Sequence, residues 1–170
     1  MITVREATVN DTTAVAQVHV RSWQVAYRGL MADEYLDQLT VEERATRYRF
    51  GSGDVTTLRT IVAIDDGSLL GFATFGLLRE VDLPETGEIF ALYVDPDCWR
   101  HGIGTTLITS AWKSLRAMSI SKVLLWVLEG NDHATRFYES QGWTADGLRR
   151  QIEVWGVSVN ELRFSRSLTD

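Results

Sequence analysis

The segment from Val94 to Leu107 constrains the fold more than any other part of the chain. It holds the end of an apolar run, a short turn, two glycines one residue apart (Gly102 and Gly104) and the start of a helical apolar pattern. Glycine has no Cβ, so the backbone there can take a positive φ or approach a ligand closely, and the first amides of a helix lack intrahelical partners. The pattern therefore predicts a strand, a turn and a helix whose start binds an anion such as a phosphate.

Two further apolar runs extend this prediction to a βαβ unit. The run 88–94 is apolar on both faces after Glu88, and the run 123–128 is equally apolar. Between them, apolar residues recur at helical spacing from about Gly104 to Ser119. Strands of this composition are typical of a sheet covered on both faces, and a strand, helix and strand in this order predict two parallel strands with a right-handed crossover.

The remaining elements are predicted from local signals. In chain order they are a strand at 2–5, a helix from 10 or 11 to about 27, short helices at 33–39 and from 40, an antiparallel hairpin of strands 60–64 and 70–77, a turn at 84–87, a helix from 131 or 132 to 142, and strands at 151–155 and 159–165. After the second short helix, Arg44, Arg47 and Arg49 follow Glu42 and Glu43, which predicts a solvated, ion-paired surface.

Composition and charge exclude several classes of protein. With 170 residues and 45% hydrophobic residues, the chain suits a single folded domain spanning 1–170. Its 23 acidic and 17 basic side chains leave no broad basic surface, so we expect no nucleic-acid partner. Cys98 is the only cysteine, and neither it nor the three histidines form a metal-ligand pattern, so we expect no disulfide and no metal. The amino terminus lacks a signal-peptide pattern and no apolar run reaches membrane-spanning length, which predicts a cytoplasmic protein without a membrane partner.

Three segments together resemble the GNAT superfamily of acetyl-CoA-dependent N-acetyltransferases, in particular its small bacterial members. They are Gly87-Glu88-Ile89-Phe90-Ala91-Leu92-Tyr93-Val94-Asp95-Pro96, Arg100-His101-Gly102-Ile103-Gly104-Thr105, and Asn131 followed by Phe137-Tyr138-Glu139-Ser140-Gln141-Gly142-Trp143. Trp99 stands where the family usually has Gln or Arg. Neither the Gly-Lys-Ser/Thr of a P-loop nor the third glycine of a Rossmann fingerprint follows Gly102.

The resemblance covers the whole chain in element order and implies both fold and function. The implied fold is α/β, a GNAT-type mixed and twisted sheet of six to seven strands with helices on both faces. The implied reaction transfers acetyl from acetyl-CoA, as cosubstrate, directly to a primary amine of a small molecule or peptide. The alternative is a non-catalytic acyl-CoA-binding or sensor module of the same fold, and a third candidate is a nucleotide-binding regulator.

The resemblance also implies the residues that bind the cosubstrate. The amides of about Ile103 to Thr106 would hold the pyrophosphate, and the backbone of Leu92 to Val94 would pair with the pantetheine arm as an added strand. The full implied set is Leu92, Tyr93, Val94, Arg100, His101, Gly102, Ile103, Gly104, Thr105, Thr106 and Asn131. Asn131 also has the place and chemistry of a helix cap, and both roles can hold together.

Two residues match the positions of catalytic groups in the family. Acetyl transfer needs a neutral amine, a donor for the thioester oxygen and a proton for the leaving thiolate. Glu88 matches the general base; its alternatives are an exposed strand end or a partner for an arginine. Tyr138 matches the residue that protonates the thiolate; its alternative is a core tyrosine with a satisfied hydroxyl. We expect the oxyanion donor to be a strand amide near Tyr93.

The acceptor amine is the least constrained part of the prediction. Trp23 and Tyr27, four residues apart on one helical face, either line the acceptor pocket with Tyr93 or form a core pair. The net charge of −6 suits a cationic amine, while a peptide amino terminus or an amino acid remains open. An exposed tryptophan such as Trp155 would suit a homodimer.

Overall fold

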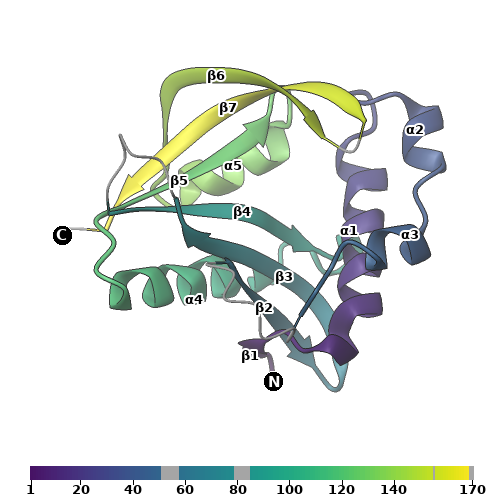
Figure 1. Ribbon diagram of the computed structural model, residues 1–170, viewed down its shortest axis with the longest axis horizontal. Helices are drawn as coiled ribbons and strands as arrows, with labels where there is room; N and C mark the ends of the chain where they lie inside the picture. The colour runs from purple at the N-terminus through teal and green to yellow at the C-terminus, as the bar shows by residue number, and fades with distance from the viewer. Residues whose placement is uncertain (51–57, 79–84, 155, 169–170) are drawn as a thin grey trace.

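A seven-stranded mixed sheet forms the centre of the molecule, with strand order β1-β2-β3-β4-β5-β7-β6 (Figure 1). This computed structural model describes residues 1–50, 58–78, 85–154 and 156–168. The strands are β1 (Thr3–Glu6), β2 (Leu58–Asp65), β3 (Ser68–Leu77), β4 (Thr86–Val94), β5 (Lys122–Leu128), β6 (Thr144–Val154) and β7 (Val157–Ser167). Only β4 and β5 pair in parallel, and the other neighbours are antiparallel. The predicted mixed sheet is confirmed.

The helices lie on both faces of this sheet, as predicted (Figure 1). They are α1 (Thr12–Ala26), α2 (Asp33–Asp37), α3 (Val41–Ala45), α4 (Ile103–Ala117) and α5 (Asp132–Ser140), with short 3₁₀ turns at Val9–Asp11 and Pro96–Cys98. Successive strand residues point to opposite faces. Val62 and Phe72 therefore pack with Val15 of α1, while Ala63 and Ala73 pack with α4. Among the described residues no helix is both long and apolar enough to cross a membrane.

The last hairpin differs most from the sequence prediction. β6 begins at Thr144, seven residues before the predicted start, and its register against β7 shifts between Ala145 and Arg149. Residues 144–149 are all exposed and mix polar with apolar types, so the alternation that marks a half-buried strand is missing. Trp155 and part of the predicted turn at 84–87 lie outside the described residues.

The parallel strands β4 and β5 separate partway along their length. They pair from Thr86 to Ile89 on β4, and no pairing continues through residues 90–94. On the other side of β4 the register against β3 shifts near Phe90, which leaves this residue with no opposite partner. A bulge of this kind increases the local bend of a strand. The structure thus opens a gap between the two central strands, next to the start of α4.

Candidate active site

The two glycines of the turn before α4 have different structural roles. Gly102 is the N-cap of α4 and has φ +79°, a left-handed conformation, and a Cβ there would meet nothing within 4 Å. Gly104 lies inside the first turn, where a Cβ would be 3.2 Å from the Phe137 ring of α5. Gly102 is required for backbone conformation, whereas Gly104 allows α4 and α5 to pack closely. The positive end of α4 is left open at this turn.

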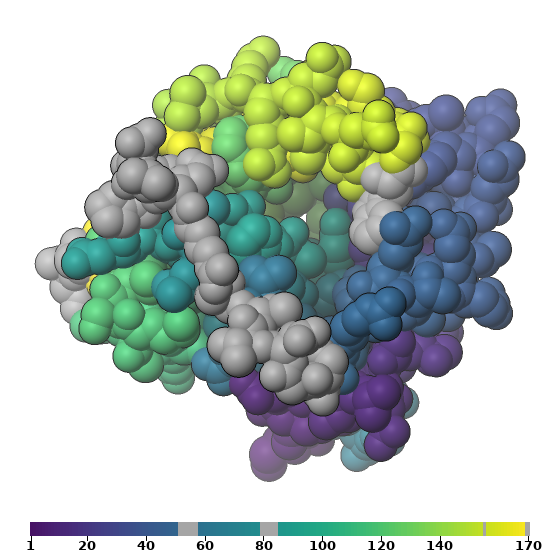
Figure 2. Space-filling view, viewed as in Figure 1, coloured from purple at the N-terminus to yellow at the C-terminus, as the bar shows by residue number. Residues whose placement is uncertain are grey.

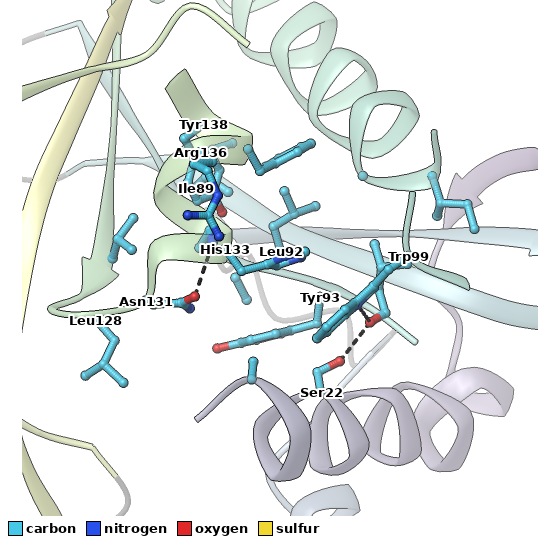
Figure 3. Close-up of a pocket in the computed structure, with 18 of the residues that line it drawn as sticks. Ser22, Ile89, Leu92, Tyr93, Trp99, Leu128, Asn131, His133, Arg136 and Tyr138 are labelled. Carbon is cyan, nitrogen blue, oxygen red and sulfur yellow. Dashed lines mark hydrogen bonds between the residues drawn. The ribbon is translucent and has the colours of Figure 1, made fainter. Parts of the chain in front are cut away.

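The gap between β4 and β5 continues into a hollow of about 630 Å³, here named the turn hollow. Its walls come from β4, the glycine turn, the end of β5 and the start of α5 (Figure 3). Arg100 and Arg136 line it and add positive charge near the start of α4. The side chain of Trp99 stacks on His133 at 4.5 Å between ring centroids. Burial, followed by the nearby Arg136 and Arg100, lowers the pKa of His133 and favours its neutral form.

The backbone of β4 presents unused polar groups to the turn hollow. The Asp95 amide donates to the Leu70 carbonyl of β3 at 2.8 Å, so alternation directs the backbone groups of Tyr93 to β3 and those of Leu92 and Val94 to the gap. The Val94 carbonyl already accepts from Ser22 Oγ at 3.0 Å (Figure 3) and from Trp99 Nε1 at 2.9 Å. The backbone of Leu92 and the Val94 amide remain for a ligand.

Not every predicted cosubstrate residue reaches the turn hollow. Gly102, Ile103, Gly104 and Thr105 line it, but His101 is exposed and is not among the lining residues. The Thr106 amide donates to the Gly102 carbonyl at 2.9 Å and is therefore already used within the helix. An anion bound at this helix start could therefore use only the amides that precede Thr106.

Asn131 caps α5 and also lines the turn hollow. Its side-chain oxygen accepts from the Ala134 amide at 3.1 Å, which caps α5. The same side chain is buried and lines the turn hollow (Figure 3). Because the cap uses only the carbonyl oxygen, the amide nitrogen can still donate two hydrogen bonds.

Tyr138 faces the turn hollow from α5 (Figure 3). The residue is only 8% exposed and its ring packs near Phe137, Trp143 and Phe164, although the hydroxyl has no hydrogen-bond partner among the described residues. Burial raises the pKa of Tyr138 well above its usual value of 10, with a smaller effect of Tyr93. The hydroxyl is therefore protonated at neutral pH and can donate a proton to a ligand in the hollow.

A second hollow of about 670 Å³, here named the aromatic hollow, lies on the other side of the bulge in β4. Figure 2 shows this face of the molecule hollowed between the β6–β7 hairpin and the segment after α3. Its aromatic lining consists of His19, Trp23, Tyr27, Tyr48, Phe50, Phe90 and Tyr93. The two hollows share six lining residues, Tyr27, Phe90, Ala91, Tyr93, Leu128 and Glu161. They therefore meet beside the bulge of β4.

Glu88 lines the aromatic hollow and not the turn hollow. Its side chain is only 7% exposed on a central strand, opposite Gly76 of β3 and Leu124 of β5. The alternative of an exposed strand end is therefore wrong. Glu88 and Tyr138 therefore line different hollows, a buried acidic residue in one and a buried tyrosine in the other.

Trp23 and Tyr27 are both core residues and pocket residues. Their rings are 5.1 Å apart, and both line the aromatic hollow. The Tyr27 hydroxyl lies 3.5 Å from that of Tyr93, where the two hollows meet. Burial is the main cause that raises the pKa of both tyrosines, so both hydroxyls stay protonated at neutral pH.

Arg44 differs from its surface prediction, whereas its neighbour His19 is a buried packing residue. His19 Nδ1 lies 2.6 Å from the Tyr48 hydroxyl, and its ring stacks on Tyr93 at 4.8 Å. Burial, with Arg44 as a smaller cause, lowers the pKa of His19 to about 3, so the ring is neutral. Arg44 is not part of a solvated surface, because it is 5% exposed and its guanidinium lies 5.1 Å from the centre of the Trp23 ring. Because Arg44 and Trp23, like Tyr48 and His19, lie more than 20 residues apart in the sequence, no local sequence pattern predicts these contacts.

Glu161 is a site residue that the sequence did not indicate. It lies on β7 where the two hollows meet, and its carboxylate accepts from Arg150 Nε at 2.7 Å. The Arg150 guanidinium in turn lies 4.1 Å from the centre of the Trp126 ring. The two charged residues are cross-strand partners in the β6–β7 register, so only the correct hairpin register could have paired them.

Comparison with known proteins agrees with this architecture. The profile of the acetyltransferase (GNAT) family matches residues 16–143. The uncharacterized N-acetyltransferase YuaI of Bacillus subtilis is 32% identical over 165 residues, which cover 95% of this chain and 91% of that protein. Spermidine N(1)-acetyltransferase of Thermoplasma acidophilum is 21% identical over 85% of this chain and 89% of its own length.

The fold is shared with solved acetyltransferase structures. The PaiA N-acetyltransferase of Thermoplasma acidophilum, crystallised in complex with coenzyme A, superposes with a TM-score of 0.75 over 98% of this chain and 99% of its own, at 20% identity. An N-acetyltransferase of Staphylococcus aureus also gives 0.75, at 17% identity over 99% of each chain. The overall fold of this chain thus belongs to a known architecture.

Proposed function

The chain belongs to the acetyltransferase (GNAT) family, and from that premise we propose that it transfers acetyl from acetyl-CoA directly to a primary amine bound in the aromatic hollow. The observation that carries this proposal is the meeting of two hollows at one bulged strand. One hollow offers an open helix start and unused strand amides, and the other offers a buried carboxylate. A donor and an acceptor could therefore approach each other beside Phe90 and Tyr93.

The turn hollow suits acetyl-CoA in each of its chemical parts. The amides of Ile103, Gly104 and Thr105 bind the pyrophosphate at the positive end of α4. The carbonyl of Leu92 and the amide of Val94 pair with the amide-bearing pantetheine arm, and the Asn131 side chain donates to the same arm. Coenzyme A in the related PaiA structure supports this choice of donor.

Three groups of the chain divide the chemistry of the transfer. Glu88 accepts the proton of the amine, directly or through a water, so that the nitrogen can attack the thioester carbon. The Leu92 amide donates to the carbonyl oxygen as negative charge develops there. Tyr138 gives its proton to the sulfur as the carbon–sulfur bond breaks, which yields the N-acetylated amine and free CoA.

A free-thiol assay over a panel of primary amines tests this proposal. We expect CoA release only when an amine is present, and a fall of about 100-fold or more in kcat/KM for Glu88→Gln, the typical size of a general-base contribution. Calorimetry with CoA run in parallel separates binding from turnover. A protein that binds CoA but acetylates no amine in the panel would instead be the non-catalytic acyl-CoA module.

A further inference from the structure

The two hollows meet at a wall of six shared lining residues, here named the junction, and its charge differs from that of either hollow. Among the described residues, Arg100 and Arg136 line the turn hollow but not the junction. Four further arginines line the aromatic hollow but not the junction, namely Arg47, Arg49, Arg59 and Arg150. Of the junction residues in the described chain, Glu161 alone carries a charge, and the other five are aromatic or aliphatic. A ligand group at the junction therefore meets a carboxylate.

The carboxylate of Glu161 is held through one oxygen. Arg150 Nε donates to Oε2 at 2.7 Å, across the β6–β7 hairpin. In the described part of the chain, no other side chain forms a hydrogen bond or an ion pair with this carboxylate. The Glu161 side chain is only 14% exposed, so its charge is weakly screened by water. Oε1 can thus accept a hydrogen bond from a ligand.

Arg150 fixes Glu161 without bringing its own charge to the junction. Its guanidinium lies 4.1 Å from the centre of the Trp126 ring, and its side chain is 36% exposed. Water therefore screens the charge of Arg150 more than that of Glu161. The negative member of this ion pair lines the junction, and the positive member is the more exposed one.

Two tyrosine hydroxyls add further acceptor oxygens at the junction. The hydroxyls of Tyr27 and Tyr93 lie 3.5 Å apart. Burial is the main cause that raises the pKa of both residues, and the negative charge of Glu161 is a smaller cause for each. A protonated hydroxyl can still accept a hydrogen bond, and the face of a tyrosine ring attracts a cation. A carboxylate, two hydroxyl oxygens and two aromatic rings together suit an ammonium ion.

We propose that Glu161 binds the acceptor amine as an ammonium ion at the junction, with Oε1 and the hydroxyls of Tyr27 and Tyr93 accepting its hydrogen bonds. This inference rests on the proposed function, because it assigns a binding residue to the amine that is acetylated. The ammonium ion releases one proton to solvent before its neutral nitrogen reacts. The overall transfer then yields the N-acetylated amine, free CoA and one proton. Glu161 thereby selects a positively charged acceptor over an uncharged molecule of the same shape.

Primary amines and the corresponding alcohols test this inference as matched pairs, because the alcohol keeps the shape and removes the charge. The probes are benzylamine with benzyl alcohol and butylamine with butanol, each titrated by calorimetry into the CoA-saturated protein at pH 7. For the pair that binds more tightly, we expect the amine to be favoured about tenfold or more in Kd, the effect of one charge-assisted hydrogen bond. This comparison needs no variant, so it tests the inference even if a substitution prevents folding.

Glu161→Gln connects the preference to one carboxylate. Glutamine keeps the size of the side chain and an oxygen that can accept from Arg150. The preference for the amine should fall below about twofold, and in the CoA-release assay KM for the amine should rise more than kcat falls. The Kd for CoA should stay within about twofold, which shows that the variant is folded.

Asp146→Asn is the matched control on the same hairpin. Arg163 Nε donates to Asp146 at 2.7 Å, as Arg150 does to Glu161, but Asp146 lines neither hollow. The control removes the charge from the same kind of cross-strand ion pair. It should keep the full preference for the amine, because its carboxylate does not reach the junction.

The outcomes separate this inference from the proposed function. Absence of amine binding, an alcohol that binds as tightly as its amine, or a preference that persists in Glu161→Gln would each overturn the ammonium site, even where CoA release shows acetyl transfer. An equal loss of preference in Asp146→Asn would also overturn it, since the ion pair would then have only a structural role. A preference that depends on Glu161, in a protein that releases no CoA with any amine, would support the ammonium site and remove the proposed transfer.

Discussion

The turn hollow and the aromatic hollow are nearly equal in size, at about 630 and 670 Å³, but they are built from different parts of the chain. The turn hollow offers mainly backbone groups from β4 and the start of α4. The aromatic hollow offers side chains from β1, α1, β2, the segment after α3 and the β6–β7 hairpin. Backbone recognition needs only a local conformation, whereas side-chain recognition needs distant residues to meet. This difference explains why the donor is easier to infer from sequence than the acceptor.

Tyr138→Phe should have the largest effect and would separate catalysis from binding within the turn hollow. The variant keeps the buried ring and removes only the hydroxyl that faces the hollow. We expect kcat at saturating acetyl-CoA to fall by about 10²- to 10⁴-fold, the typical contribution of a positioned general acid. The Kd for CoA, measured by calorimetry, should change by less than about twofold, because ring packing is conserved.

A matched change elsewhere controls for the loss of a tyrosine hydroxyl. Tyr35→Phe alters a residue of α2 that lines neither hollow. It should leave kcat unchanged. Unchanged turnover in the Tyr138 variant would remove this hydroxyl from the mechanism, and the turn hollow would then be only a binding site.

Gly102→Asp tests whether backbone amides at the start of α4 form the binding site for the pyrophosphate of CoA. The substitution forces a non-glycine residue into φ +79° and puts a carboxylate beside the start of α4. Loss of favourable contacts and added repulsion should weaken CoA binding by about 100-fold, or about 3 kcal/mol. Calorimetry with CoA measures this effect, and acceptor binding to the aromatic hollow should stay within about twofold.

Gly67→Asp is a closely matched control for backbone strain. Gly67 lies in the β2–β3 turn, has φ +79° and has nothing within 4 Å of a Cβ, as at Gly102. Both variants should lose similar stability in urea denaturation, but only Gly102→Asp should lose CoA affinity. If both variants bind CoA with the same Kd as the unsubstituted protein, the start of α4 is not the phosphate-binding site.

Most of the fold could be predicted because its signals are local. Apolar runs, the turn at Asp66 and Gly67, and the helix start at Gly102 each depend on a few adjacent residues. The start of β6 could not be predicted, because its first residues are exposed, show no alternation of apolar and polar types, and are held in place by pairing with β7. The fold prediction was therefore least accurate where tertiary pairing, rather than local pattern, determines the strand.

The candidate site shows the same contrast between features that local sequence determines and features that tertiary contacts determine. Backbone positions such as Leu92 and Ile103 were implied by the family resemblance of two nearby segments, and the structure places them on the turn hollow. The pair of His19 with Tyr48 and the pair of Arg150 with Glu161 were not predicted, because each joins elements that meet only in the folded chain. Arg44 was predicted at the surface, since a single charged residue gives no sign that it will stack on a buried tryptophan.

The pH dependence of stability should depend on the aromatic hollow through His19. Burial lowers its pKa to about 3 in the folded protein, against about 6.5 when unfolded. Between these values the unfolded chain binds a proton that the folded protein does not, so stability falls as pH decreases below about 6.5. The slope approaches 1.4 kcal/mol per pH unit, which gives a loss of about 2 kcal/mol at pH 5. Urea denaturation at pH 7 and pH 5 measures it.

His19→Gln isolates this contribution from other titrating groups. Glutamine can still hydrogen-bond Tyr48 but has no ionisable ring. The variant should be less stable at pH 7 and should lose less stability between pH 7 and pH 5. The Arg5 side chain keeps the pKa of Asp11 far below its usual value, so that pair contributes only below about pH 4. An unchanged pH dependence in the variant would mean that His19 does not titrate as its burial requires.

Trp99→Phe should have the smallest effect and would show how independent the two hollows are. Phenylalanine keeps a ring against His133 but cannot donate to the Val94 carbonyl, where the Trp99 indole donates at 2.9 Å. One neutral hydrogen bond contributes about 0.5–1.5 kcal/mol, so the Kd for CoA should rise about three- to tenfold. Ser22→Ala removes the other donor to the same carbonyl and should give a similar change. Both variants should leave acceptor binding unchanged; a rise in the acceptor Kd instead would show that the end of β4 couples the turn hollow to the aromatic hollow.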